Sequence, residues 1–287
     1  LHPDLGGGIG EGFKVTGGYN FVNNTADPMD DHSHGTHVAG IVAANGQLKG
    51  VAPDASLKGY KVLDGGGSGY SSWIIAGIEQ SVTDGVHILN ASLGGPGSPA
   101  DPMAQAMNNA SLAGVVCVVA AGNDGSYFTI GSPGVAARAI TVGATDNSDQ
   151  IAPFSSRGPV KPDFSLKPDV LAPGVLNNST IPGGEYERYS GTSMATPHVA
   201  GAIALFMEKH SGFSPSEIKS LFSQSALDLG YDVWTQGMGR IDLPSVFNLP
   251  GFLVSPNLLS FGMASLSETI WTTADTLVVS NISDGQQ

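Results

Sequence analysis

Cysteine is nearly absent from this sequence. Cys117 is the single one among 287 residues, so no disulfide can form within the chain. It lies in the apolar run 115–119, and we interpret it as a buried strand residue in preference to a thiol nucleophile or a redox switch. A chain without disulfides fits the cytoplasm and also fits many secreted bacterial proteins, so cysteine usage leaves the compartment open.

Basic residues are also scarce, with 12 Lys and Arg against 25 Asp and Glu, and the formal net charge is −13. This balance argues against nucleic acid or an anionic membrane as a partner. No apolar run approaches the roughly 20 residues that cross a bilayer, so we expect no membrane span. The chain has no phosphate-binding Gly-Lys-Ser/Thr motif, and residues 6–10 lack the spacing of a dinucleotide fingerprint. We therefore expect no cofactor.

Hydrophobic residues, by contrast, make up 41% of the chain, and 40 glycines suit tight turns and close packing. Short β-rich runs alternate with helical patterns over the first half. The predicted strands are residues 19–22, 57–63, 87–92, 115–121 and 139–142, and the predicted helices are residues 36–44, 70–83 and 102–112. Continuous apolar strands with interleaved helices indicate an α/β fold: a doubly wound, mostly parallel sheet with helices on both faces.

The second half changes character twice. Residues 154–174 are rich in Pro and Gly and are interpreted as ordered loop, followed by a buried helix over residues 192–210. Ser214 and Glu217 have the spacing of a capping box, which predicts another helix start. After residue 250 the pattern is β-type only. We expect one domain over residues 1–250, and in residues 251–287 the opening strands of a C-terminal β-sandwich.

Three motifs carry the chemistry. Residues 191–201, Gly-Thr-Ser-Met-Ala-Thr-Pro-His-Val-Ala-Gly, place Ser193 where a loop turns into an apolar helix, so free backbone N–H groups can lie beside its hydroxyl. Residues 31–40, Asp-His-Ser-His-Gly-Thr-His-Val-Ala-Gly, place His34 at the start of another helix. The strand 118–121 is followed closely by Asn123. A nucleophile, a base and an amide donor are the parts that acyl transfer needs.

Together these motifs resemble the subtilisin-like serine proteases, the subtilases, over about residues 1–245. The resemblance implies a secreted or cell-surface serine endopeptidase, a monomer, that hydrolyses an extended polypeptide through an acyl-enzyme. Ser193 would be the nucleophile, His34 the base and Asn123 a donor in the oxyanion hole. His37 would pack inside its helix.

The resemblance also implies how a substrate would bind. Segments 67–69 and 92–94 would pair with the peptide backbone. Ala120, Gly122 and Gly131 would line the primary specificity pocket, and Gly131 would leave that pocket open to large apolar side chains. These residues are Gly67, Ser68, Gly69, Ser92, Leu93, Gly94, Ala120, Gly122 and Gly131.

One family feature is missing: the triad aspartate, which in the family ends the first core strand, just before a segment like residues 2–5. The chain is therefore expected to be a protease fragment, weakly active or inactive as it stands. Asp4, Asp30 and Asp31 are poor substitutes for this acid. Residues 43–50 are too short for the family's strong calcium loop, so no metal is expected there.

Two alternatives remain at this point: a subtilase-fold binding module that has lost catalysis, and a metal-dependent hydrolase built on His32, His34 and His37.

Overall fold

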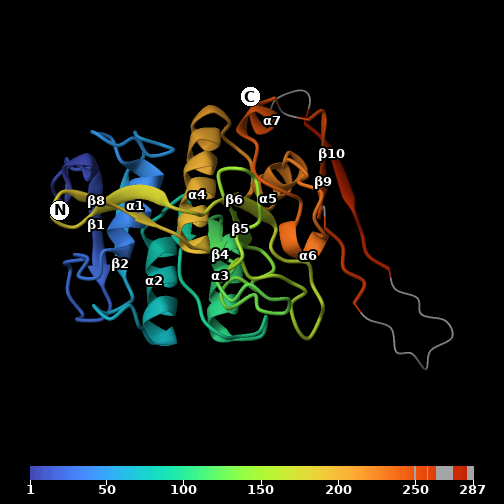
Figure 1. The fold of residues 1–287 in the computed structure, drawn as a ribbon, viewed down its shortest axis with the longest axis horizontal. Helices are drawn as coiled ribbons and strands as arrows, with labels where there is room; N and C mark the ends of the chain where they lie inside the picture. Colours follow the sequence, from blue (N-terminus) through green and yellow to red (C-terminus); the bar gives the residue numbers. More distant parts are fainter. Residues whose placement is uncertain (249, 257, 263–273, 283–287) are drawn as a thin grey trace.

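The strand β4 (Val116–Ala120) is buried along its whole length, and much of the fold is arranged around it (Figure 1). This computed structural model describes residues 1–248, 250–256, 258–262 and 274–282. β4 is the second strand of a four-stranded parallel sheet of order β3-β4-β5-β6. Its partners are β3 (Ile88–Ala91), β5 (Ile140–Thr145) and β6 (Val170–Pro173).

Alternate residues of β4 enter two different cores, because successive strand side chains point to opposite faces of a sheet. Val116 and Val118 pack in one core with α4 (Thr192–Lys209) and α5 (Pro215–Gln224). Cys117 and Val119 pack in the other core with α2 (Ser71–Thr83) and α3 (Pro102–Leu112). The sheet is thus covered on both faces, which confirms the predicted α/β fold and the buried position of Cys117.

A second parallel pair, β1 (Val15–Asn20) with β2 (Leu57–Lys61), lies at the other end of the molecule, close to α1 (His34–Ala43) (Figure 1). Among the described residues no hydrogen-bonded ladder joins β2 to β3, so the parallel strands fall into two sheets. The antiparallel hairpin β7 (Asn177–Ile181) and β8 (Glu185–Tyr189) covers α1 and ends just before α4.

Short elements complete the described chain: η1 (Pro3–Leu5), α6 (Val233–Gln236), α7 (Leu243–Phe247), β9 (Phe252–Ser255) and β10 (Val278–Asn281). β9 pairs with β10 and packs on α5, where the Gln224 side chain donates to Phe252 O and accepts from Val254 N. Leu253 is buried in the same core as α4. A separate β-sandwich module in residues 251–287 stays a prediction, and part of that range lies outside the described residues.

One sequence prediction was wrong. Residues 154–174 are not loop throughout, because Val170–Pro173 forms β6, a buried strand beside β5. The apolar run between Pro168 and Pro173 is short, and the two prolines favoured the interpretation as a loop. The capping box at Ser214 and Glu217 is confirmed. None of the helices in the described part of the chain is long and apolar enough to span a bilayer.

Candidate active site

Ser193 is the second residue of α4 and is held against the segment that follows β3. Its hydroxyl donates to the carbonyl oxygen of Ser92 at 3.2 Å, while the Ser92 hydroxyl donates to the carbonyl oxygen of Ser193 at 2.8 Å. This reciprocal exchange fixes the N-terminus of α4 to the end of β3. It also means that the hydroxyl of Ser193 does not donate to a histidine in this structure.

Asn123 lies three residues beyond the end of β4, and its amide has a fixed orientation. Its Oδ1 accepts from the backbone N–H of Thr192 at 2.9 Å and from the Thr192 hydroxyl at 3.0 Å. A methyl group built on Gly191 would lie 3.6 Å from both Asn123 Nδ2 and the backbone nitrogen of Ser193. Two N–H donors therefore border one small space above Gly191, the arrangement that binds a developing oxyanion.

His34 is the first residue of α1 and lines a pocket of about 270 Å³ together with Ser193 and Asn123. Among the described residues its ring nitrogens have no hydrogen-bond partner. Burial, and then the neighbouring His32, lowers the pKa of His34 from its usual value of 6.5. The lowered pKa favours the neutral ring, which is able to accept a proton.

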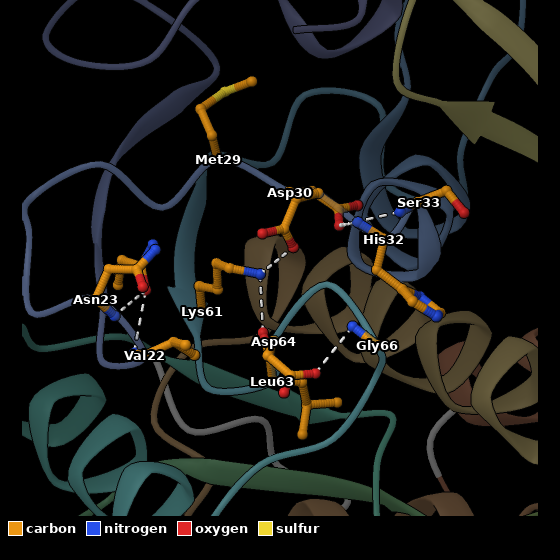
Figure 2. Close-up of polar contacts among 12 residues, drawn as sticks. Val22, Asn23, Met29, Asp30, His32, Ser33, Lys61, Leu63, Asp64 and Gly66 are labelled. Carbon is orange, nitrogen blue, oxygen red and sulfur yellow. Dashed lines mark hydrogen bonds and ion pairs between the residues drawn. The ribbon is translucent and has the colours of Figure 1, made fainter.

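The carboxylates next to His34 in sequence are occupied by other groups (Figure 2). Asp30 accepts from the backbone N–H groups of His32 at 2.9 Å, Ser33 at 3.1 Å and Thr36 at 2.8 Å, and from the Thr36 hydroxyl at 2.7 Å. Burial opposes ionisation, but these donors outweigh it and the pKa of Asp30 is lowered. Asp30 thus caps the start of α1.

Two more carboxylates are committed elsewhere. Asp31 forms an ion pair with Lys61. Lys61 also donates to the carbonyl oxygen of Leu63 at 2.8 Å (Figure 2). The buried Asp4 accepts from Leu48 N at 2.8 Å and from the Tyr186 hydroxyl at 2.7 Å. In the described chain, therefore, none of these acids orients the ring of His34.

The structure does not support a histidine-based metal centre. His37 is fully buried, its Nε2 lies 3.0 Å from the carbonyl oxygen of Glu187, and its ring is stacked on Tyr189. Within the described residues, no three His, Cys, Asp or Glu side chains are grouped so that they could hold a metal ion.

Of the predicted substrate-binding residues, Gly67, Ser68 and Gly69 lie in an exposed turn, whereas Ser92 and Ala120 are buried. Gly67 has a φ of +76° in a tight turn closed by Asp64, and Gly122 has a φ of +112° just after β4. Gly95 and Ser132 exchange backbone hydrogen bonds at 2.9 and 2.8 Å. A side chain on Gly131 would meet the Gly95 carbonyl oxygen at 2.6 Å, so glycine is needed there for this approach. That Gly131 also opens a specificity pocket stays a prediction.

Sequence reasoning did not single out Ser33, Tyr189 or Ser190, which also line this pocket. Tyr189 lies only four residues before Ser193, but it follows no periodic pattern that could have singled it out. Ser33 precedes His34 directly, and only its backbone conformation in the structure sets it apart.

The chain is similar to proteins of known family and structure. Residues 2–240 match the family model described as the subtilase family. The chain belongs to the subtilase family. It is 44% identical over 250 residues to Subtilisin E of Bacillus subtilis (strain 168), an alignment that covers 84% of this chain and 61% of that relative.

Two other similar proteins extend the comparison. Subtilisin Savinase of Lederbergia lenta is 42% identical over 232 residues, covering 80% of each protein. The crystal structure of a cold adapted subtilisin-like serine proteinase superposes with a TM-score of 0.70 at 33% identity, over 84% of this chain and 82% of that one. This subtilase chain therefore spans less than two thirds of the length of some relatives that it matches.

Proposed function

We propose that this subtilase chain carries the catalytic machinery of a serine endopeptidase that cleaves polypeptides through an acyl-enzyme. One observation carries the proposal: two N–H donors, from Ser193 and Asn123, border a common space above Gly191, and both residues line a pocket together with His34. Acyl transfer needs a nucleophile, a base and such a donor pair.

In the proposed reaction, His34 removes the proton of the Ser193 hydroxyl as its oxygen attacks the scissile carbonyl carbon. The hydroxyl first leaves the carbonyl oxygen of Ser92, to which it donates at rest. The Ser193 N–H and the Asn123 amide then stabilise the oxyanion of the tetrahedral intermediate. The protonated His34 gives its proton to the departing amine, and water then hydrolyses the acyl-enzyme.

The third member of the triad, an acid that orients His34, is proposed to come from outside these 287 residues. Asp4, Asp30 and Asp31 are each bound to other groups, as described above. β2 and β3 each have one edge with no ladder partner among the described residues, and a strand lying between them would join the two parallel sheets. Without that acid, turnover is expected to fall by about 3 × 10⁴, the figure measured in subtilisin itself.

The proposed substrate is a polypeptide in extended conformation. Segments 67–69 and 92–94 would pair with its backbone, and residues 120–122 and 131 would surround a large apolar side chain. The proposed setting is secreted or cell-surface, with the protein acting as a monomer and without a metal or organic cofactor.

The first test is replacement of Ser193 by alanine in the longest form of the protein that hydrolyses a peptide. Ser193→Ala should abolish hydrolysis and labelling by a peptidyl phosphonate, whereas Ser148→Ala, at an exposed loop serine, should change neither. Hydrolysis that survives Ser193→Ala, or that a chelator stops, would contradict a serine mechanism. Peptide binding without any hydrolysis would instead favour a binding module on the subtilase fold.

The pH dependence of the same hydrolysis tests the assignment of His34. Because burial lowers the pKa of His34 from 6.5, kcat/KM for the residual hydrolysis by these 287 residues should rise with pH through a midpoint below 6.5. In a form that supplies the orienting acid the midpoint should be higher, because a carboxylate beside the ring stabilises its protonated form. A midpoint above 6.5 for the 287 residues alone would contradict a buried His34 as the base.

A further inference from the structure

The residue before the proposed base has an unusual backbone conformation. Ser33, the N-cap of α1, has a φ of +82° and a ψ of −27°. Residues other than glycine rarely adopt a φ in this range, because their Cβ atom lies too close to the backbone. Such a residue is found only where the surrounding structure holds it in this conformation. Ser33 directly precedes His34, so its conformation contributes to the direction in which α1 starts, together with the cap formed by Asp30.

Three hydrogen bonds hold Ser33 in this conformation. Its backbone N–H donates to Asp30 Oδ1 at 3.1 Å, and its carbonyl oxygen accepts from His37 N at 3.0 Å. Both of these partners lie close by in sequence. The third bond joins the Ser33 hydroxyl to the hydroxyl of Tyr189 at 2.8 Å, across 156 positions of the chain.

Tyr189 is itself held firmly. Its ring is stacked on the ring of the buried His37, with centroids 4.3 Å apart and an angle of 17° between the planes. Its hydroxyl donates to Glu187 Oε2 at 3.1 Å, so the Ser33 hydroxyl acts as the donor to Tyr189. Tyr189 ends β8, and the chain reaches Ser193 only four residues later.

We propose that Tyr189 is a positioning residue for His34: its hydroxyl holds the strained Ser33, and through Ser33 it sets the His34 ring relative to Ser193. The element that leads into the nucleophile is thereby tied to the element that begins with the base. This inference rests on the proposed function for its catalytic readout, but the contact itself is independent of that function.

A plain substrate contact is the competing role, because Tyr189 also lines the pocket. The two roles differ in what they change. Loss of a substrate contact raises KM and leaves kcat unchanged, whereas a displaced base lowers kcat and leaves KM unchanged. A displacement of about 1 Å can cost about a hundredfold in rate, so loosening by part of that distance should cost about tenfold.

The test uses Tyr189→Phe, which removes the hydroxyl and keeps the ring on His37, together with Ser33→Ala. Each should lower kcat about tenfold with little change in KM, and the double variant should be no worse than either single variant, since both remove the same bond. The acidic limb of the pH profile should move to higher pH as the His34 ring gains contact with water, because burial is the main cause of its lowered pKa.

Tyr186→Phe is the matched control, because it removes a tyrosine hydroxyl from the same strand that bonds to Asp4 instead. It should lower stability but leave kcat and the pH profile unchanged.

Failure of this inference can be told apart from failure of the proposed function by NMR of the His34 ring in the Ser193→Ala background. The ring titration should shift upward in Tyr189→Phe and stay in place in Tyr186→Phe, whether or not the protein hydrolyses peptides. An unchanged His34 titration with unchanged kcat, or a change confined to KM, would overturn the positioning role.

Discussion

Gly191 illustrates how a missing side chain can be a functional feature. Its φ and ψ, both 160°, are extended and open to any residue, so backbone strain does not require glycine here. What glycine provides is the empty space between the Ser193 N–H and the amide of Asn123.

Gly191→Ala should therefore fold normally and lose activity. The added methyl group would meet its neighbours at 3.6 Å, an ordinary contact, but it would occupy the place of the oxyanion. We expect kcat to fall by about 10²–10³, the cost of losing an oxyanion donor, with little change in the thermal unfolding midpoint. Steady-state kinetics measures the fall in kcat, and calorimetry on the same sample measures the thermal unfolding midpoint.

Gly251→Ala is the matched control for this variant, since a methyl group there would contact nothing within 4 Å. Gly251→Ala should leave both kcat and the thermal unfolding midpoint unchanged. A Gly191→Ala protein with full activity would show that the space above Gly191 is not used in the reaction.

At the scale of elements, α4 connects the site to the core. Its first turn carries Ser193, and its last turns carry Phe206, which is fully buried and makes ring contacts with Phe213, Phe222 and Phe247. The position of the nucleophile is thus supported by packing at the far end of the same helix.

Phe206→Ala should reduce the free energy of unfolding by about 3–5 kcal/mol, because it removes a buried ring and leaves a cavity among three others. Urea denaturation measures this loss. Leu112→Ala, at a residue of α3 that is 64% exposed, should cost much less. Similar losses in the two variants would mean that the ring cluster does not carry the packing of α4.

Elements with strong local signals were predictable from the sequence. The helix predicted at residues 102–112 has the bounds of α3, and the structure shows that Asp101 caps it and that a proline stands at its first position. The apolar run of β4 was equally clear. β7 and β8 were not predicted, because their polar residues are fixed by tertiary contacts: Ser179 and Thr180 donate to carbonyl oxygens of α1 at 2.7 and 2.8 Å.

The same contrast holds at the site. The motifs singled out His34, Ser193 and Asn123, and the structure places all three around one pocket, although their catalytic roles stay predictions. The contact between Ser33 and Tyr189 could not be predicted, because it depends on a strained φ angle and on a hairpin folded over α1.

For the molecule as a whole, a buried cluster of three charged groups ties the start of β6 to α5. Asp169 contacts Lys167 at 2.6 Å and Lys219 at 2.9 Å, and both Lys167 and Asp169 are almost fully buried. Burial lowers the pKa of Lys167 from its usual 10.5 to about 7. At alkaline pH the folded protein can therefore keep this lysine neutral while Lys219 still pairs with Asp169.

Stability should consequently rise with pH between about 7 and 9, above which the buried thiol of Cys117, whose pKa is raised from 9.0 to about 12, acts in the opposite direction. In this window Lys167 is protonated in the unfolded chain and neutral in the folded one, so unfolding takes up a proton and is disfavoured as pH increases. The slope is at most about 1.4 kcal/mol per pH unit. Lys167→Met should flatten this rise in chemical denaturation measured across the window, whereas Lys58→Met, at a surface lysine, should keep it. An equal slope in both variants would contradict the assignment to Lys167.

The reciprocal hydrogen bonds between Ser92 and Ser193 also bear on which ligands could release the Ser193 hydroxyl. At rest the proton of the Ser193 hydroxyl is held by the Ser92 carbonyl oxygen, so a small electrophile entering the pocket meets an alcohol that is not in contact with the base. A peptide paired along residues 92–94 can offer its own N–H to that carbonyl oxygen and release the hydroxyl. Under the proposed mechanism, that exchange would leave the Ser193 hydroxyl free to turn toward His34, so the backbone of a bound peptide would contribute to reaction as well as to binding.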